Sequence, residues 1–148
     1  MKVKEIMTKD ITSITPDTNA SEALELLLKM RISGLPVLDE KNKLVGMFTE
    51  KEVLSAILPS YVEKVGRFMY QENPKAVKQK TLAFRHLKVK DVMRKTSVTL
   101  DEDTALCEVA RIMLTQKARR TPVLNKAKEV VGIVARGDVV EALFKEYK

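Results

Sequence analysis

An internal repeat with a fixed spacing of 86 residues constrains this chain of 148 residues more than any other feature. The opening "KVKEIM" (2–7) returns as "KVKDVM" (88–93), and "GLPVL" (34–38) aligns with "RTPVL" (120–124). At this spacing the alignment needs no gap, and about 16 of its 57 paired positions are identical. Because a fixed-period repeat indicates an architecture built from copies of one unit, we expect two copies of one folding unit.

The alignment also sets the domain boundaries that we expect. We predict a first unit at 1–58, a connecting segment at 59–87 and a second unit at 88–148. A chain of this length can bury a sizeable core, so the two units are expected to share one compact body. Hydrophobic residues make up 45% of the sequence and charged residues 32%, which is ordinary for a soluble globular protein.

In the first copy, a β-branched stretch and a turn precede a helix. "ITSIT" (11–15) is expected to be a short strand, "PD" turns the chain, and Thr18 is expected to cap the following helix. Apolar residues at helical spacing predict the buried face of this helix in both copies: Ala20, Ala23, Leu24, Leu27 and Met30, then Leu106, Val109, Ala110 and Met113. The single cysteine, Cys107, excludes an intramolecular disulfide, and we expect it on the buried side of its helix.

Two strands and a last helix complete the unit. "LPVLD" predicts a strand, "EKNK" a hairpin turn, and "LVGMFT" (44–49) a second strand. "EKEVLSAIL" (50–58) returns to helical period. The expected order is therefore strand, helix, strand, strand, helix.

This order, with two local motifs, resembles the CBS domain, a family named after cystathionine β-synthase. The motifs are a Pro-Val on the middle strand and a Gly-apolar-x-Thr-x-x-Asp passage into the last helix, seen here as "LPVL…VGMFTEKE" and "TPVL…VGIVARGD". The resemblance covers about 115 of the 148 residues. It implies a mixed α+β fold of two tandem βαββα units, packed as a pseudo-twofold pair in which each sheet face is covered by its partner unit. We expect a stand-alone CBS pair, also called a Bateman module.

The resemblance implies an adenosine-nucleotide site in the cleft between the units. In the second copy the family's ribose-binding acid is Asp138, while its hydroxyl position is Ala135, where the adjacent Arg136 could replace the missing phosphate contact. In the first copy the hydroxyl is present as Thr49, but the acid is the longer Glu52. For both acids, helix capping and favourable placement near a helix N-terminus are the alternative interpretation.

The same resemblance implies further contacts to phosphate and base. Arg119 and Arg120 precede the strand proline and are expected to face phosphates, with a solvated charged turn as the alternative. Four residues are expected to lie along the base, some through their backbone: Ile133, Met47, Thr121 and Pro122. Ile133 and Met47 are equally interpretable as core strand residues. We expect the site with Asp138 to bind better, because its acid has the family's length and three arginines accompany it.

The connecting segment is the part that the family does not explain. Tyr61, Val65, Phe68 and Met69 lie at helical spacing, Leu82, Phe84 and Leu87 form a second apolar patch, and Pro74 separates the two. The segment carries six basic and two acidic residues, a net charge of +4 within a chain of +7. We interpret it as one or two amphipathic helices packed on the pair or on a second subunit. Nucleic-acid binding through its basic residues and the second half is the alternative.

Membrane insertion, catalysis and metal binding are not expected. No apolar run approaches the roughly 20 residues that span a bilayer, and the charged N-terminus leads into the repeat without a signal peptide, so we expect a cytoplasmic protein. We see no nucleophile–base pair and no glycine-rich phosphate loop, and we expect no enzyme and no obligatory cofactor. His86, the only histidine, lacks ligand residues at metal spacing.

We therefore predict a regulatory module that binds AMP, ADP, ATP or S-adenosylmethionine and signals to a separate, unknown effector protein. A nucleic-acid-binding module, or a structural dimer with degenerate sites, is the alternative. The family also implies a homodimer formed through helices 50–58 and 136–146. Six apolar residues are expected to be available for it: Val53, Leu54, Ile57, Val139, Val140 and Leu143.

Overall fold

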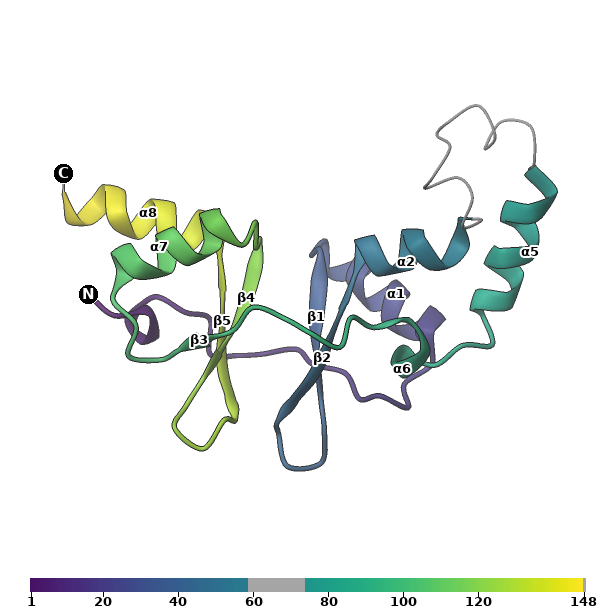
Figure 1. Cartoon of the computed structure of the whole chain (residues 1–148), viewed down its shortest axis with the longest axis horizontal. Helices are drawn as coiled ribbons and strands as arrows, with labels where there is room; N and C mark the ends of the chain where they lie inside the picture. The colour runs from purple at the N-terminus through teal and green to yellow at the C-terminus, as the bar shows by residue number, and fades with distance from the viewer. Residues whose placement is uncertain (59–73, 148) are drawn as a thin grey trace. The chain divides into compact units, whose positions relative to one another are not determined.

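The computed structural model describes residues 1–58 and 74–147, with only the backbone of Pro74 included (Figure 1). Tyr61, Val65, Phe68 and Met69 lie outside these residues, so their helical pattern stays a prediction. The chain forms two compact units, each assembled from separate stretches of sequence. The central unit comprises Ile14–Val37 and Val45–Lys95, and the C-terminal unit comprises Met1–Ser13, Leu38–Leu44 and Thr96–Lys148.

The first repeat supplies most of the central unit. A two-stranded sheet, β1 and β2, is accompanied by helices on either side of it in sequence. The elements are α1 (Ala20–Met30), β1 (Gly34–Leu38), β2 (Leu44–Thr49), α2 (Glu50–Ile57), α5 (Pro74–Phe84) and α6 (Val89–Val92). The strand predicted at 44–49 is confirmed, because its apolar run is bounded by a polar turn and by the charged start of α2.

The second repeat supplies most of the C-terminal unit. Its sheet has the order β3-β4-β5, with β3 parallel to β4 and β4 antiparallel to β5. The elements are η1 (Val3–Glu5), β3 (Leu100–Asp101), α7 (Leu106–Thr115), β4 (Arg120–Leu124), β5 (Val130–Ala135) and α8 (Arg136–Glu146). Together the units confirm the predicted mixed α+β fold class.

The opening segment of each repeat belongs to the unit built from the other repeat. Val3, from the first opening, is fully buried in the core of the C-terminal unit, and its backbone N–H donates to Thr104 at 2.9 Å. Val89, from the second opening, is fully buried in the core of the central unit, and its N–H donates to Thr18 at 2.8 Å. The duplicated "KVK" openings are therefore exchanged between the two repeats.

Lysine pairs flank these buried valines and contact one carboxylate in each unit. Lys2 and Lys4 lie 3.5 and 2.9 Å from Asp103. Lys88 and Lys90 lie 3.6 and 3.2 Å from Asp17, which is 86 positions before Asp103. The hydrogen bond from the nearer lysine is the main reason that the pKa of each carboxyl is below its ordinary value of 3.8. These side chains are exposed, so the ion pairs contribute little to stability.

Each exchanged segment then crosses a strand at a glycine. Met47 and Arg94 exchange two backbone hydrogen bonds of 2.9 and 2.8 Å, and Ile133 and Thr8 exchange an equivalent pair. A Cβ atom on Gly46 would lie 2.7 Å from the Arg94 carbonyl oxygen and 2.8 Å from the Met93 sulfur. A Cβ on Gly132 would meet Met7 in the same way. The repeated glycine is needed because the opening segment passes this close to the strand.

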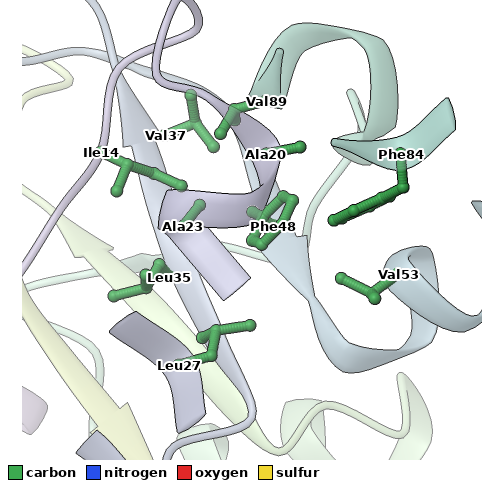
Figure 2. Packing of buried hydrophobic residues seen from close by; sticks show 10 residues of the cluster. All are labelled: Ile14, Ala20, Ala23, Leu27, Leu35, Val37, Phe48, Val53, Phe84 and Val89. Carbon is green, nitrogen blue, oxygen red and sulfur yellow. The ribbon is translucent and has the colours of Figure 1, made fainter. Parts of the chain in front are cut away.

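The core of the central unit includes a residue from the connecting segment. Phe84, at the end of α5, points into the same cluster as Phe48 of β2 and Val53 of α2 (Figure 2). Leu87 packs against this cluster, whereas Leu82 is exposed. The expected apolar patch at 82–87 is thus correct for Phe84 and Leu87 and wrong for Leu82. Consequently α5 is anchored on the central unit, and its closest packing is with α2.

Two local predictions in the first copy are wrong. The helix cap is Asn19, not Thr18, because the Asn19 side chain accepts from the backbone N–H groups of Ser21 and Glu22. The Thr18 hydroxyl accepts from the Thr15 backbone instead. The expected strand at 11–15 is reduced to a single parallel bridge between Ile14 and Val37.

Two expected core residues are on the surface. Met30, the last residue of α1, is exposed. Cys107 is also exposed, because the buried face of α7 is made by its neighbours Leu106, Val109 and Met113. The predicted faces are otherwise confirmed: Ala20, Ala23 and Leu27 are buried, and Leu24 and Ala110 are partly buried against the cores.

The close approach at Gly46 predicts a specific loss of stability. Gly46→Ala should lower the free energy of unfolding by about 1–3 kcal/mol, because the new methyl group meets a backbone carbonyl that cannot rotate away. Gly137→Ala is the matched control, since a Cβ there has nothing within 4 Å and the residue lies in α8, where alanine is favoured. Denaturant unfolding should show the loss for Gly46→Ala alone. Equal midpoints for both variants and the parent would contradict the account of the crossing.

Candidate nucleotide-binding site

The start of α8 places an acidic side chain at the edge of the C-terminal unit's sheet. The Asp138 Oδ2 atom accepts a hydrogen bond of 3.0 Å from the backbone N–H of Ala135, three residues earlier. The capping contact that we considered for Asp138 is therefore present. Within the described residues, Oδ1 has no hydrogen-bond partner. One carboxylate oxygen thus fixes the side chain while the other is available to a further donor.

Arg120 lies on β4, the strand next to β5, from which the chain continues into α8 and Asp138. Arg120 and Ala135 are direct cross-strand partners in the β4–β5 pair. The Arg120 side chain is half-buried, and burial lowers the pKa of its guanidinium, while the negative charge of Asp138 acts in the opposite direction. Its Nε atom is buried without a hydrogen-bond partner in the described part of the chain. A buried charged donor in this state is expected to bind an anionic acceptor if one is offered.

The backbones of two further arginines, Arg119 and Arg136, meet near the start of α8. Arg119 and Arg136 are both exposed, and the backbone N–H of Arg136 donates to the Arg119 carbonyl at 3.0 Å. Arg119, Arg120 and Arg136, which we predicted as phosphate contacts, therefore lie at the same end of the β4–β5 pair as Asp138, where α8 begins. The local positive charge exceeds the single negative charge of Asp138, and this favours an anion.

The corresponding place in the central unit is arranged differently. The Thr49 hydroxyl donates to one oxygen of Glu52, and Arg94 lies 3.9 Å from the other oxygen. The Glu52 side chain is only 13% exposed, whereas Arg94 is 44% exposed. Each oxygen of Glu52 thus has a neighbouring donor, Thr49 by a hydrogen bond and Arg94 at ion-pair distance. Glu52 lies in the first turn of α2, which agrees with the alternative of favourable placement near a helix N-terminus, while no helix-start N–H in the described residues donates to its carboxylate.

Arg94 is a site residue that the sequence reasoning missed. It belongs to the exchanged opening segment, and its backbone pairs with Met47 in the central unit. The repeat places Thr8 at the matching position, so the alignment gave no reason to consider a basic residue there. The available signal was the charge difference between Thr8 and Arg94 at the end of otherwise similar openings.

Met47 and Ile133 are buried but lie outside the two helix-covered cores. Each precedes a core residue in its strand, Phe48 and Val134 respectively. Because side chains alternate along a strand, Met47 and Ile133 face the sheet side opposite the helices. In the C-terminal unit, Arg120 and Pro122 lie on this same side of the sheet, because they alternate along β4 with Val123, which belongs to the core.

Thr121 lies on the core side of its strand. It alternates with Arg120 and shares a face with the core residue Val123. It is fully buried, and its hydroxyl has no partner within the described residues. A contact between Thr121 and a base would therefore use its backbone rather than its side chain, whereas Pro122 can present its ring.

Searches for other kinds of site give negative results over residues 1–58 and 74–147. No group of three or more histidine, cysteine or acidic side chains is arranged to hold a metal ion there. His86 is exposed at the end of α5. None of the helices in this part of the chain combines the length and apolarity needed to cross a bilayer.

Comparison with known proteins identifies relatives with the same repeat. A family model for the CBS domain matches residues 3–59 and again residues 89–145. The chain is 38% identical to CBS domain-containing protein CBSX1, chloroplastic, of Arabidopsis thaliana, over 95% of this chain and 63% of that protein. It is 31% identical to the uncharacterised protein MJ1426 of Methanocaldococcus jannaschii, over 97% and 91%. The chain thus spans less than two thirds of CBSX1 but nearly all of MJ1426.

Solved structures extend the comparison to the fold. CBSX2 of Arabidopsis thaliana in complex with AMP is 28% identical, with a TM-score of 0.76 over 99% of this chain and 98% of that one. The CBS domain pair of protein MJ0100, in complex with 5′-methylthioadenosine and S-adenosyl-L-methionine, is 26% identical, with a TM-score of 0.70 over 97% and 99%. With two family matches that together cover most of its length, this chain belongs to the CBS-domain family as a tandem CBS pair.

Proposed function

We propose that the protein is a regulatory ligand sensor that binds an adenosine-containing nucleotide and passes the signal to a separate partner. The observation that carries the proposal is the half-buried Arg120, whose Nε atom is buried and has no hydrogen-bond partner in the described part of the chain, on the strand beside the start of α8 that carries Asp138. Two related structures support the ligand class, since CBSX2 was solved with AMP and the MJ0100 pair with 5′-methylthioadenosine and S-adenosylmethionine.

The chemistry of the residues fits such a ligand. A carboxylate accepts two hydrogen bonds, so Asp138 can hold a ribose diol while its backbone cap keeps it in place. A guanidinium presents several donors in a fixed plane and suits phosphate oxygens. Arg120 is partly removed from water, and its attraction for a phosphate is less screened there than at an exposed position. The exposed Arg119 and Arg136 add to the field.

We further propose that the C-terminal unit supplies the stronger set of contacts. Its acid has one oxygen engaged by the backbone, Arg120 is close enough for the Asp138 charge to influence the pKa of its guanidinium, and Arg119 and Arg136 flank β4 and β5 at the same end. In the central unit both oxygens of Glu52 are engaged, by Thr49 and by Arg94. A ribose approaching Glu52 would share its oxygens with Thr49 and Arg94, and we expect a smaller net gain there. No obligatory cofactor and no catalytic role are included in this proposal, and the cytoplasm remains the expected compartment.

Substitution of the two acids should separate their roles. Asp138→Ala should weaken AMP binding by at least about tenfold, the equivalent of one lost charge-assisted hydrogen bond of roughly 1.5 kcal/mol. Glu52→Ala should have a smaller effect. Isothermal calorimetry measures both. Asp138→Asn is the control for capping, because its amide oxygen can still accept from Ala135 while the charge is lost. If Glu52→Ala removes binding and Asp138→Ala leaves it unchanged, the assignment is wrong.

A second candidate function, nucleic-acid binding, is favoured by helix α5. Lys75 and Lys78 are exposed on it, on the face opposite Val77 and Phe84, and Arg85 and His86 follow at its end. Between residues 74 and 90 there is no acidic residue. Lysine is depleted in protein–protein interfaces but contacts phosphate backbones, so this surface fits a polyanion better than a protein.

A thermal-shift comparison distinguishes the two functions. AMP or ATP should raise the melting temperature at near-physiological salt, as a ligand selective for the folded state must. An oligonucleotide bound through α5 should instead bind at low salt and dissociate as salt rises. If an oligonucleotide binds firmly at near-physiological salt and no adenosine compound raises the melting temperature, nucleic-acid binding becomes the preferred function. No response to either class would leave a structural dimer with degenerate sites.

We also propose a homodimer through exposed apolar side chains of the last helices. Leu54 and Val140 occupy matching repeat positions and are 55% and 66% exposed. Phe144 of α8 is exposed as well. The other four expected interface residues are not freely available, because Val53 and Val139 are buried and Ile57 and Leu143 are packed against the cores. The expectation that all six were available is therefore wrong.

Sedimentation tests the dimer. The protein should sediment as a dimer at tens of micromolar, and the paired substitution Leu54→Glu and Val140→Glu should produce a monomer, because it places charges in the apolar contact. Glu141→Ala on the same helix is the control and should remain dimeric, since it lies outside the apolar set. A monomeric parent protein at that concentration would remove the proposal.

A further inference from the structure

The core of the central unit includes a side chain from outside the repeat, and the residues of α1 explain why it fits. Ala20 and Ala23 of α1 are small, whereas the matching positions of α7 hold Leu106 and Val109. The side chain of Phe84, at the end of α5, is 3% exposed and belongs to the same buried cluster as both alanines (Figure 2). Because protein interiors are closely packed, the short side chains of α1 leave room for this ring.

Hydrogen bonds attach the end of α5 to the start of α1. The Asn19 Nδ2 atom donates to the Arg85 carbonyl oxygen at 3.0 Å. The Ala20 backbone N–H donates to the Leu87 carbonyl oxygen at 2.9 Å. Together with the buried ring of Phe84, these two bonds anchor the C-terminal end of α5 on the central unit.

One exposed side of α5 is basic. Lys75 and Lys78 are one helical turn apart and Arg85 follows Lys78 after two turns, so the three lie along one side. All three are exposed, and none forms an ion pair within residues 1–58 and 74–147. We call these three residues the basic face of α5. Their unpaired charges create a local positive potential that favours a polyanion.

A lipid surface does not fit the basic face of α5. A basic helix that binds a membrane inserts a free apolar side into the boundary between headgroups and acyl chains. In α5 that side is already used, because Phe84 is buried and Val77 is half-buried. Among residues 75–84, Leu82 is the only large apolar side chain that is exposed.

A single-stranded nucleic acid fits less well than a double helix. Proteins that bind single strands commonly stack the bases on exposed aromatic rings. Phe84 is the only phenylalanine, tyrosine or tryptophan between residues 74 and 90, and its ring is buried. The basic face therefore offers contacts to phosphates and none by stacking. A double helix presents two strands of phosphates at close spacing, which suits such contacts.

We propose that the basic face of α5 is a docking site for the phosphate backbone of a double-stranded nucleic acid, bound without regard to its sequence. This rests on the second candidate function, and it adds the residues involved, the form of the nucleic acid and the lack of base recognition. None of the three residues belongs to either candidate nucleotide site, so AMP binding is a separate property.

Fluorescence anisotropy with a labelled duplex of random sequence, measured at increasing salt, tests the site. The variant Lys75→Gln with Lys78→Gln should weaken binding at low salt by at least about tenfold. It should also reduce the steepness of log affinity against log salt by about 1.8, because each phosphate contact contributes about 0.9. Lys41→Gln with Lys126→Gln is the charge-matched control, since both lysines are exposed on hairpin turns outside α5. The control should bind the duplex as the parent does.

Two further probes test the form of the nucleic acid. A second duplex of unrelated sequence should bind equally well, and a single strand of the same length should bind more weakly. Tighter binding of the single strand, or a strong preference for one sequence, would overturn the backbone-only account. If the two paired variants lose equal affinity, or if the α5 variant loses none, the site is wrong while nucleic-acid binding stays a candidate. If the parent binds no duplex even at low salt, the site and the second candidate function fail together.

Discussion

The docking of each opening segment onto the body of the other repeat is the contact on which the rest of the structure depends. Val3 and Val89 are fully buried in cores to which their own repeats contribute little else. Burying a valine completely contributes about 1.5–3 kcal/mol, more than the exposed lysine–aspartate pairs beside it. Each unit also needs the opening's methionine to lie against a strand glycine. Neither repeat contains all the parts of a finished core, which is why one chain has the same short opening twice.

This exchange also determines what the two candidate sites contain. The openings end beside the strand positions Met47 and Ile133, so the residue at the end of each opening is brought to the sheet. Because one opening brings Arg94 and the other Thr8, a cation reaches the acid of the central unit but not that of the C-terminal unit. The C-terminal unit instead obtains its cation from its own strand, as Arg120. Two similar repeats thus form unequal candidate sites. Glu52 has Thr49 and Arg94 as neighbouring donors, whereas the Asp138 unit has Arg120, whose buried Nε atom has no partner among residues 1–58 and 74–147.

Much of the local structure could be predicted from the sequence, and the exchange could not. The hairpin and last helix of each repeat follow from strong apolar runs separated by polar turns, and 44–49 coincides with β2. The helix start was misplaced by one residue because Thr18 and Asn19 are both good caps, and only the backbone path decides which side chain reaches the free N–H groups. The sequence pattern does not indicate which unit each opening segment packs on, because "KVK" fits either repeat equally well. For the same reason the alignment identified Asp138 and Glu52 but missed Arg94, which arrives from the other repeat.

Native mass spectrometry of the intact protein, mixed with equal concentrations of AMP and adenosine, tests the central claim most directly. It reports which ligand remains bound to the folded chain and whether the chain is a dimer, without any substitution. The account predicts ions whose added mass is that of AMP, well in excess of any adenosine adduct. A spectrum that shows the protein without any bound ligand, or with equal occupancy by AMP and adenosine, would contradict the account.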